Sequence, residues 1–165
     1  MTFKSLARFG KLLLFLGAFV VLFTVFLRCF FIDVDVVRGS SMEPYLVNND
    51  VVAVVKNHND SYFVGNVVVL LDSYGIGYSM VKRVIAVEGD VVSVTKKGHV
   101  FVNGVPVSVV DVDDPLSLVN YCLKEDEYFV IGDNREDSYD SRMFGVCNGI
   151  QILGRVLNRI WPWFR

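Results

Sequence analysis

The sequence has few of the residues that bind metal ions in proteins, with two histidines and three cysteines among 165 residues. His58 and His99 stand apart beside turn-forming residues, which is typical of solvated loops. No cluster of histidines and cysteines has the spacing of metal ligands, so we expect no metal site. Two interpretations of Cys122 and Cys147 stay open: they form a disulfide outside the cytoplasm, or they are two buried free thiols.

An excess of positive charge is also lacking. The 16 Lys and Arg residues against 18 Asp and Glu residues give a formal net charge of -2. A nucleic-acid-binding domain usually carries a basic surface, so we expect no nucleic-acid partner. The sequence contains no internal repeat, low-complexity segment or long linker, and 165 residues are enough for one domain.

Hydrophobic residues, in contrast, make up 53% of the sequence and are concentrated near its start. Residues 12–27 contain no charged side chain, and after Arg28 the apolar run continues to Ile32. A helix needs about 20 apolar residues to cross a bilayer. Residues 12–32 therefore predict a transmembrane anchor, provided that the Arg28 side chain extends to the interface. Three basic residues precede the anchor and place residues 1–11 in the cytoplasm as an N-terminal tail: Lys4, Arg8 and Lys11.

Two other interpretations of this segment are weaker. A cleavable signal peptide would have a shorter apolar region and then a small-x-small cleavage site, whereas bulky residues occupy positions 28–33. A buried helix of a soluble protein would have one apolar stripe, whereas apolar residues here lie on all sides. The sequence therefore favours a retained anchor.

From Asp33 onward the sequence has the short β-branched runs and turn residues of a β protein. Asn103-Gly104 is the strongest hairpin signal in the chain. The pattern predicts a mainly β fold, a compact antiparallel sheet or barrel that forms one extracytoplasmic domain over residues 33–165. Residues 116–122 are ambiguous, and the expected strands are 33–38, 51–55, 67–71, 81–87, 91–95, 99–102, 105–110, 128–131 and 150–157.

The C-terminal tail is aromatic and basic. Tryptophan prefers the membrane interface, where both its apolar body and its N–H are satisfied, so the tail is predicted to contact the membrane surface. The alternative is that Trp161 and Trp163 cap the β core.

Two side chains in the β region are candidates for catalysis, but neither residue is diagnostic by itself. Small residues before Ser41 leave its hydroxyl accessible, although most loop serines are simply solvated. Lys82 lies in an apolar strand, and if it points inward, burial lowers its pKa and produces a neutral amine that accepts a proton. A lysine on the solvent face is the commoner arrangement. A third segment, residues 132–142, is either a solvated polar loop or a platform for catalytic side chains.

In this order, the three segments resemble the signature regions of type I signal peptidases, the bacterial leader peptidase family of Ser/Lys-dyad proteases. The sequence GSSMEP at 39–44 is similar to the nucleophile segment, VKRVIAVEGD at 81–90 to the base segment, and GDNREDSYDSRMFG at 132–145 to the polar segment. The segment Gly65–Val69 is similar to the family's strand-leading GD-V-V-V segment. The Gram-positive-type members also resemble this chain at Gly154-Arg155 and in the Trp161-Pro162 tail. The resemblance extends from the anchor to the end of the chain.

The resemblance implies a catalytic role for each matching residue. Ser41 matches the nucleophile and Lys82 the general base, while Ser138 matches the hydroxyl that orients the lysine amine. Asp140 and Arg142 match the pair that holds the site together.

The same resemblance implies an oxyanion hole built on the backbone N–H of Ser41, since Gly39 stands where some members have a serine. Neither a metal nor an organic cofactor is needed. Two departures bear on the pocket or a local turn: Tyr45 replaces the usual threonine, and Val87-Glu88 replaces a small-Pro pair.

The implied substrates are signal-peptide-bearing preproteins with small side chains at the first and third positions before the cut. They are expected to bind as an added strand. The candidate pocket walls, each of which is also plausible as plain core, are Val36, Met42, Met80 and Val81. The implied location is the bacterial cytoplasmic membrane, with a single span in the lipid bilayer, the N-terminus inside and the catalytic domain outside.

Three alternatives differ from a housekeeping signal peptidase. The nearest is a specialised processing peptidase of the same family, of a pilus, conjugation or organelle type, although the arginine of GDNRE, Arg135, favours the bacterial housekeeping type. A self-cleaving transcriptional repressor would have a basic helix-turn-helix where this chain has an anchor. An inactive membrane-anchored β module that binds exported chains is disfavoured, because Ser41, Lys82, Ser138 and Asp140 are all present.

Overall fold

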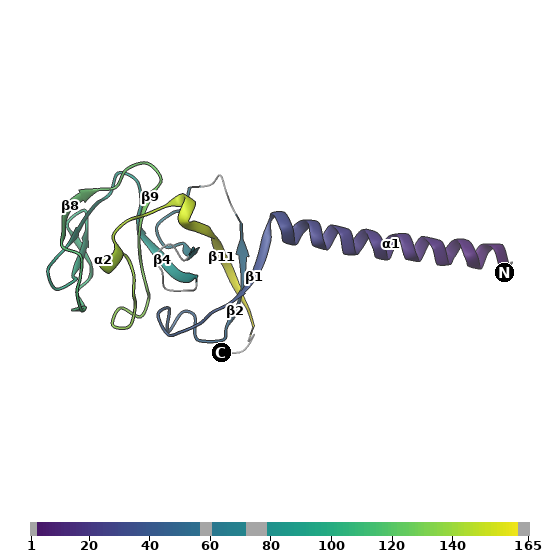
Figure 1. The fold of residues 1–165 in the computed structure, drawn as a ribbon, viewed down its shortest axis with the longest axis horizontal. Coiled ribbons are helices and arrows are strands. Elements are labelled where there is room, and N and C mark those ends of the chain that lie inside the picture. Colours follow the sequence, from purple (N-terminus) through teal and green to yellow (C-terminus); the bar gives the residue numbers. More distant parts are fainter. Residues whose placement is uncertain (1–2, 57–60, 72–78, 162–165) are drawn as a thin grey trace.

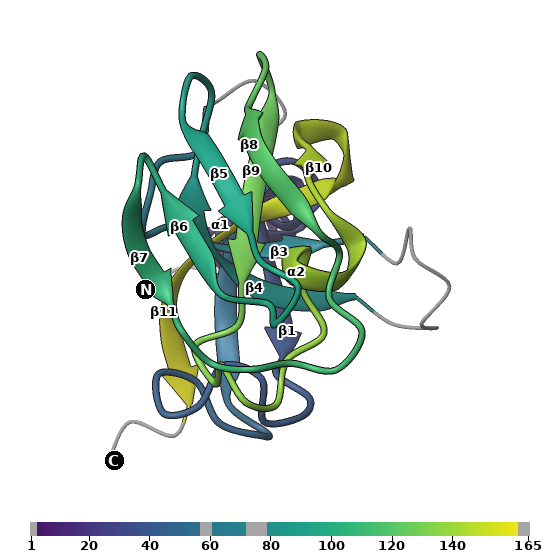
Figure 2. The same ribbon diagram turned by 90° about the vertical axis from the view of Figure 1, so that its left-hand side faces the viewer.

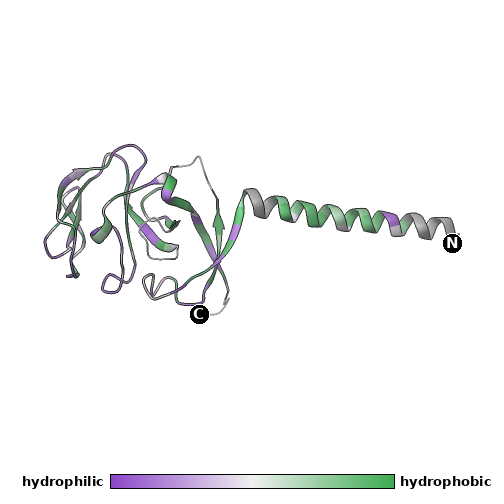
Figure 3. Ribbon diagram, in the orientation of Figure 1, coloured by the Kyte–Doolittle hydropathy of each residue, from purple (hydrophilic) through white to green (hydrophobic). Residues whose placement is uncertain are grey.

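The computed structural model describes residues 3–56, 61–71 and 79–161. It opens with one long helix, α1 (Phe3–Phe30), which projects from the β domain (Figure 1). Residues 9–26 have a mean hydropathy of 2.3 and are exposed in the structure, so by length and composition this helix could cross a membrane. In Figure 3, where the ribbon is coloured by hydropathy, most of this stretch has the colour of hydrophobic residues.

The helix differs in its bounds from the predicted anchor at 12–32. It begins earlier, at Phe3, and it ends at Phe30, because Ile32 already belongs to the first strand. From this point aspartates alternate with valines, and such a period of two with β-branched residues favours a strand over a helix.

The predicted mainly β, antiparallel fold is confirmed. The described residues form one sheet of seven strands and a second sheet of four, and within each sheet all strand pairs are antiparallel. The large sheet has the order β1 (Ile32–Val36), β2 (Val51–Val55), β11 (Ile152–Trp161), β3 (Val67–Leu70), β4 (Met80–Ala86), β9 (Glu127–Ile131) and β10 (Cys147–Asn148). The small sheet, which faces the viewer in Figure 2, has the order β7 (Val105–Ser108), β6 (Val100–Val102), β5 (Val91–Val94) and β8 (Leu118–Cys122).

Close packing of the large sheet depends on a glycine in β11. A Cβ atom at Gly154 would lie 2.3 Å from the carbonyl oxygen of Val55, far inside van der Waals contact. The register of β11 against β3 shifts between Ile152 and Gly154. The glycine therefore lets β11 bend between β2 and β3, and it explains why a residue without a side chain stands inside a strand.

Several element predictions need correction. The ambiguous segment 116–122 contains β8, and β11 continues to Trp161, beyond the predicted end at residue 157. Three short elements were not predicted: α2 (Ser141–Phe144), β10 and the 3-10 turn η1 (Gly149–Gln151). Elements of two to four residues have too little periodicity to be recognised in a sequence.

Cys122 and Cys147 are free thiols, so they form no disulfide, but only one of the two is buried as the second interpretation required. Cys122 is exposed, whereas Cys147 is fully buried and donates to the Tyr128 carbonyl oxygen. Burial raises the pKa of Cys147 to about 12, so its thiol stays protonated and unreactive.

Of the two isolated histidines and the two tail tryptophans, the structure describes His99 and Trp161. His99 is not simply solvated, because its Nε2 lies 2.6 Å from the Asp111 carboxylate. Trp161 is 58% exposed at the end of β11, so it does not cap the core. His58 and Trp163 lie outside the described residues.

Candidate active site

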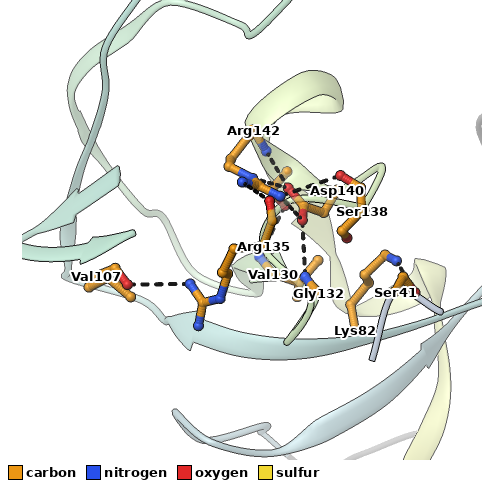
Figure 4. Close-up of polar contacts among 10 residues, drawn as sticks. Ser41, Lys82, Val107, Val130, Gly132, Arg135, Ser138, Asp140 and Arg142 are labelled. Carbon is orange, nitrogen blue, oxygen red and sulfur yellow. Dashed lines mark hydrogen bonds and ion pairs between the residues drawn. The ribbon is translucent and has the colours of Figure 1, made fainter. Parts of the chain in front are cut away.

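Strand β4 brings Lys82 to Ser41. The burial pattern of β4 alternates, and Lys82 is one of its inward residues, with 3% of its surface exposed. Its Nζ lies 2.9 Å from the Ser41 Oγ (Figure 4). Loss of solvation is the main cause that lowers the Lys82 pKa from 10.5 to about 8; Asp140 and Asp137 oppose the shift and Arg142 adds to it.

The loop that carries Ser41 is fixed at several points. Gly39 has a positive φ of 86°, and its N–H donates to the Asn48 side chain over 3.0 Å. Met42 is buried in the core beside Ser41. The Ser41 carbonyl oxygen accepts from the backbone N–H of Asn134 over 3.0 Å. The loop is therefore tied to the polar segment, which lies more than ninety residues later in the sequence.

The polar segment is organised by a buried ion pair. Asp140 and Arg142 are both fully buried, and the guanidinium donates two hydrogen bonds of 2.9 Å to the carboxylate. Asp140 also accepts from the backbone N–H of Gly132 over 3.0 Å, and Arg142 donates to the Arg135 carbonyl oxygen over 2.7 Å. Figure 4 shows this network beside the Ser41–Lys82 pair. The segment is thus a rigid, internally bonded platform rather than a solvated loop.

Ser138 lies at the site but does not make the hydrogen bond that the resemblance implies. Its side chain is 8% exposed, and its Oγ has no hydrogen-bond partner in the part of the chain that the structure describes. The Lys82 amine bonds to Ser41 instead. A buried hydroxyl without a partner is costly, so Ser138 is available to a group that arrives with substrate or to the amine after a rotation.

Gly132 is a site residue that we did not single out from the sequence. A Cβ atom there would lie 2.2 Å from the Ser138 Oγ and 2.4 Å from the Ser41 carbonyl oxygen. The residue therefore permits the close approach of the two serine segments. The signal in the sequence was its position at the start of the polar segment, directly after a buried strand.

We expect Gly132→Ala to abolish most activity, because the added methyl must push Ser41 or Ser138 out of place. Displacements of about 1 Å at a catalytic group commonly cost about a hundredfold in rate. The measurement is kcat/KM of the purified variant, with its folding checked by circular dichroism. Gly17→Ala is the control, because a Cβ at Gly17 meets no atom within 4 Å and the helical backbone of α1 accommodates alanine without strain. Unchanged activity in Gly132→Ala would contradict the role of this contact.

A cleft of about 590 Å³ runs beside the serine–lysine pair. All four candidate pocket residues, Val36, Met42, Met80 and Val81, line it together with Gly39, Ser41 and Lys82. Met42 and Met80 are also core residues, with 1% and 5% exposure, so they present little surface to the cleft.

The cleft also includes residues that were not predicted. Asp137 and Tyr139 line it, and the Asp137 carboxylate accepts a hydrogen bond from the Ser40 hydroxyl. Asp35 lines it from the end of β1. These acidic residues gave no separate signal, because charged residues in loops and edge strands are usually solvated.

The two departures from the family pattern lie outside this cleft. Tyr45 is half exposed and lies under the guanidinium of Arg83, with 4.7 Å between Cζ and the ring centroid. Val87 and Glu88 line a separate, larger cavity of about 860 Å³ that contains none of the predicted site residues. Neither departure changes the walls of the cleft at Ser41.

A buried lysine against a serine hydroxyl, on a β domain that follows an apolar helix, is the arrangement expected of a serine peptidase with a Ser/Lys pair. Residues 8–161 match the model of the family described as signal peptidase, peptidase S26. The chain is 35% identical to signal peptidase IB of Staphylococcus aureus (strain COL), with 88% of this chain and 85% of the relative covered. It is 31% identical to the "Probable signal peptidase I-2" of Synechocystis sp., with 86% and 69% covered.

The chain therefore belongs to the signal peptidase I family. Among solved structures, a signal peptidase I from Enterococcus faecalis V583 is similar, with 24% identity and a TM-score of 0.43 over 60% of this chain and 98% of that one.

Proposed function

We propose that this protein is a membrane-anchored endopeptidase that removes N-terminal signal peptides from exported preproteins, cutting after a small-x-small site with Ser41 and Lys82 as a catalytic dyad. The observation that carries this proposal is the 2.9 Å contact between the Ser41 Oγ and the Nζ of the buried Lys82. It is supported by membership of the signal peptidase I family.

The reaction begins when neutral Lys82 takes the proton of the Ser41 hydroxyl. The oxygen attacks the scissile carbonyl carbon, and the backbone N–H of Ser41 receives the developing oxyanion. The protonated lysine then gives its proton to the leaving amine, and the mature protein departs. A water molecule, deprotonated by Lys82, hydrolyses the ester on Ser41 and releases the signal peptide.

The lysine must be uncharged to begin this cycle, and its burial serves that purpose. A pKa of about 8 leaves about a tenth of the amine neutral at pH 7, whereas at a pKa of 10.5 almost none would be neutral. In the proposed mechanism, Asp140 and Arg142 act as positioning residues, since they hold the segment that carries Ser138. Ser138 orients the amine after Ser41 has reacted, when the hydroxyl that Lys82 now contacts is no longer available.

The proposed substrate lies extended in the cleft between β1 and β4. Strand β1 is at the edge of the large sheet. Strand β9 pairs with β4 only from Arg83 onward, so residues 80–82 have a strand on one side alone in the described structure. Two open strand edges that face one cleft suit an added peptide strand. Val36 and Val81 then restrict the pockets, so that only small side chains fit.

The proposed topology follows from α1. Its apolar residues span the lipid bilayer, the basic residues before it stay in the cytoplasm, and the β domain from Asp33 onward lies outside at the bacterial cytoplasmic membrane. The short distance in sequence between α1 and Ser41 keeps the cleft near the membrane surface, where a signal peptide emerges.

The test is cleavage of a synthetic preprotein with an Ala-x-Ala site by the detergent-solubilised full chain. Wild type should cut after the second alanine, and Ser41→Ala should lose at least about a thousandfold in kcat/KM. Ser93→Ala, a serine in the small sheet, is the matched control and should retain full activity. Mass spectrometry of the products gives the cut position. Cleavage that survives Ser41→Ala would refute the dyad, and cleavage at another motif alone would indicate a specialised processing peptidase.

A further inference from the structure

The edge strand β1 has backbone N–H groups that point away from β2, the one strand that it pairs with in the described part of the chain. In an antiparallel pair, alternate residues bond to the neighbouring strand, and the others face outward. The N–H of Val37 donates to the Asp50 carbonyl oxygen, so the N–H groups of Val34 and Val36 belong to the outward set. Val36 is also a cleft residue, five positions before Ser41.

Both outward N–H groups are already occupied by side chains. The Val34 N–H donates to the Asp33 carboxylate over 2.9 Å, and the Val36 N–H donates to the Asp35 carboxylate over 2.7 Å. The alternation Asp-Val-Asp-Val places one carboxylate before each outward amide. Such a carboxylate blocks strand addition, because the amide has no free hydrogen to offer.

The two aspartates differ in how firmly they are held. Asp33 forms an ion pair of 3.1 Å with Lys56, whose own backbone N–H donates to the Phe31 carbonyl oxygen. Asp35 is exposed and takes part in no ion pair within the described ranges. Of the two, Asp35 is nearer to Ser41 and easier to displace.

We propose that Asp35 limits substrate binding in the cleft: its carboxylate occupies the Val36 N–H to which the backbone of an extended preprotein must bond, and the substrate binds by displacing it. This inference rests on the proposed function, because it takes the preprotein as the occupant of the cleft. It assigns to Asp35 a role in affinity, distinct from the chemistry at Ser41.

The displacement has a defined thermodynamic signature. A peptide carbonyl that takes the Val36 N–H gains one hydrogen bond, but the Asp35 carboxylate loses one, so much of the gain cancels. Removal of the carboxylate removes that competition in the Michaelis complex and in the transition state alike. A change that is equal in both states alters KM and leaves kcat unchanged. Because the competing bond is a single hydrogen bond to a charged group, KM should fall about threefold to tenfold.

The test compares Asp35→Ala and Asp35→Asn with wild type in the full detergent-solubilised chain, using the same Ala-x-Ala peptide. We expect Asp35→Ala to lower KM about threefold to tenfold at constant kcat. The KM of Asp35→Asn should lie between those of wild type and Asp35→Ala, since the asparagine amide oxygen still accepts from the Val36 N–H but carries no charge. Asn158→Ala is the matched control, because Asn158 accepts from the N–H of the next residue in the same way, in β11.

A second readout separates this inference from the proposed function. Binding of a fluorescent Ala-x-Ala peptide to Ser41→Ala, with and without Asp35→Ala, gives Kd by anisotropy without any cleavage. A tighter Kd in the double variant supports the competition even if the dyad assignment fails. An unchanged or raised KM and Kd in Asp35→Ala would overturn the inference, as would an equal gain in Asp35→Asn, which would indicate charge repulsion in place of competition for the amide.

Discussion

Arg142→Met should lower the free energy of unfolding by about 3–5 kcal/mol and abolish most activity. The guanidinium is fully buried and makes two hydrogen bonds to Asp140, which is fully buried as well. Without it, Asp140 keeps its contact with the Gly132 N–H but loses its counter-charge. A buried carboxylate without a counter-charge either destabilises the fold by its large desolvation energy or takes up a proton. Urea unfolding followed by circular dichroism measures the change.

Arg83→Met is the matched control for this variant. Arg83 also makes two charged hydrogen bonds to an aspartate, of 2.7 and 2.6 Å to Asp133. Its side chain is 25% exposed, however, and that of Asp133 is 14% exposed, so water solvates what the substitution leaves behind. Its loss of stability should be less than half that of Arg142→Met. Equal losses in the two variants would show that burial does not set the contribution of these pairs.

Much of the β fold could be predicted from local sequence signals. The Asn103-Gly104 pair predicts a tight hairpin, and in the structure both residues have positive φ while Val102 pairs with Val105 across the turn. The β-branched run at 51–55 forms β2 with alternate burial. These signals work because strand pairing and turn geometry depend on a few neighbouring residues.

The architecture of the site depends on contacts that no local pattern contains. Ser41 and Lys82 are separated by forty-one positions, and Ser40 and Asp137 by ninety-seven. The sequence alone gave Lys82 two possible orientations, and only the resemblance favoured the inward one. The absence of a Ser138 hydrogen bond, the role of Gly132 and the occupied edge of β1 depend on positions of single atoms, which periodicity does not specify.

Lys82→Met should have opposite effects on activity and stability. Methionine has nearly the shape of lysine without the amine, so it fills the same apolar space but supplies no base. We expect a loss of at least about a thousandfold in kcat/KM, as for the removal of other general bases that act as a unit with a nucleophile. Lys124→Met, at an exposed position, is the control and should change neither activity nor stability.

The stability of Lys82→Met should exceed that of wild type at pH 7, and the excess should depend on pH in one direction. Burial lowers the Lys82 pKa from 10.5 in the unfolded chain to about 8 in the folded protein. Each unit of that pKa difference corresponds to about 1.4 kcal/mol, so below pH 8, where both states are protonated, the charged amine costs the fold roughly 3–4 kcal/mol. Between these two pKa values the folded state has released its proton and the unfolded state has not, so the stability of wild type rises with pH.

The stability advantage of Lys82→Met over wild type should therefore be full below pH 8 and vanish near pH 10.5, as measured by urea unfolding of both proteins across this range. A constant advantage at every pH would show that Lys82 is not desolvated, and the proposed neutral base would lose its physical basis.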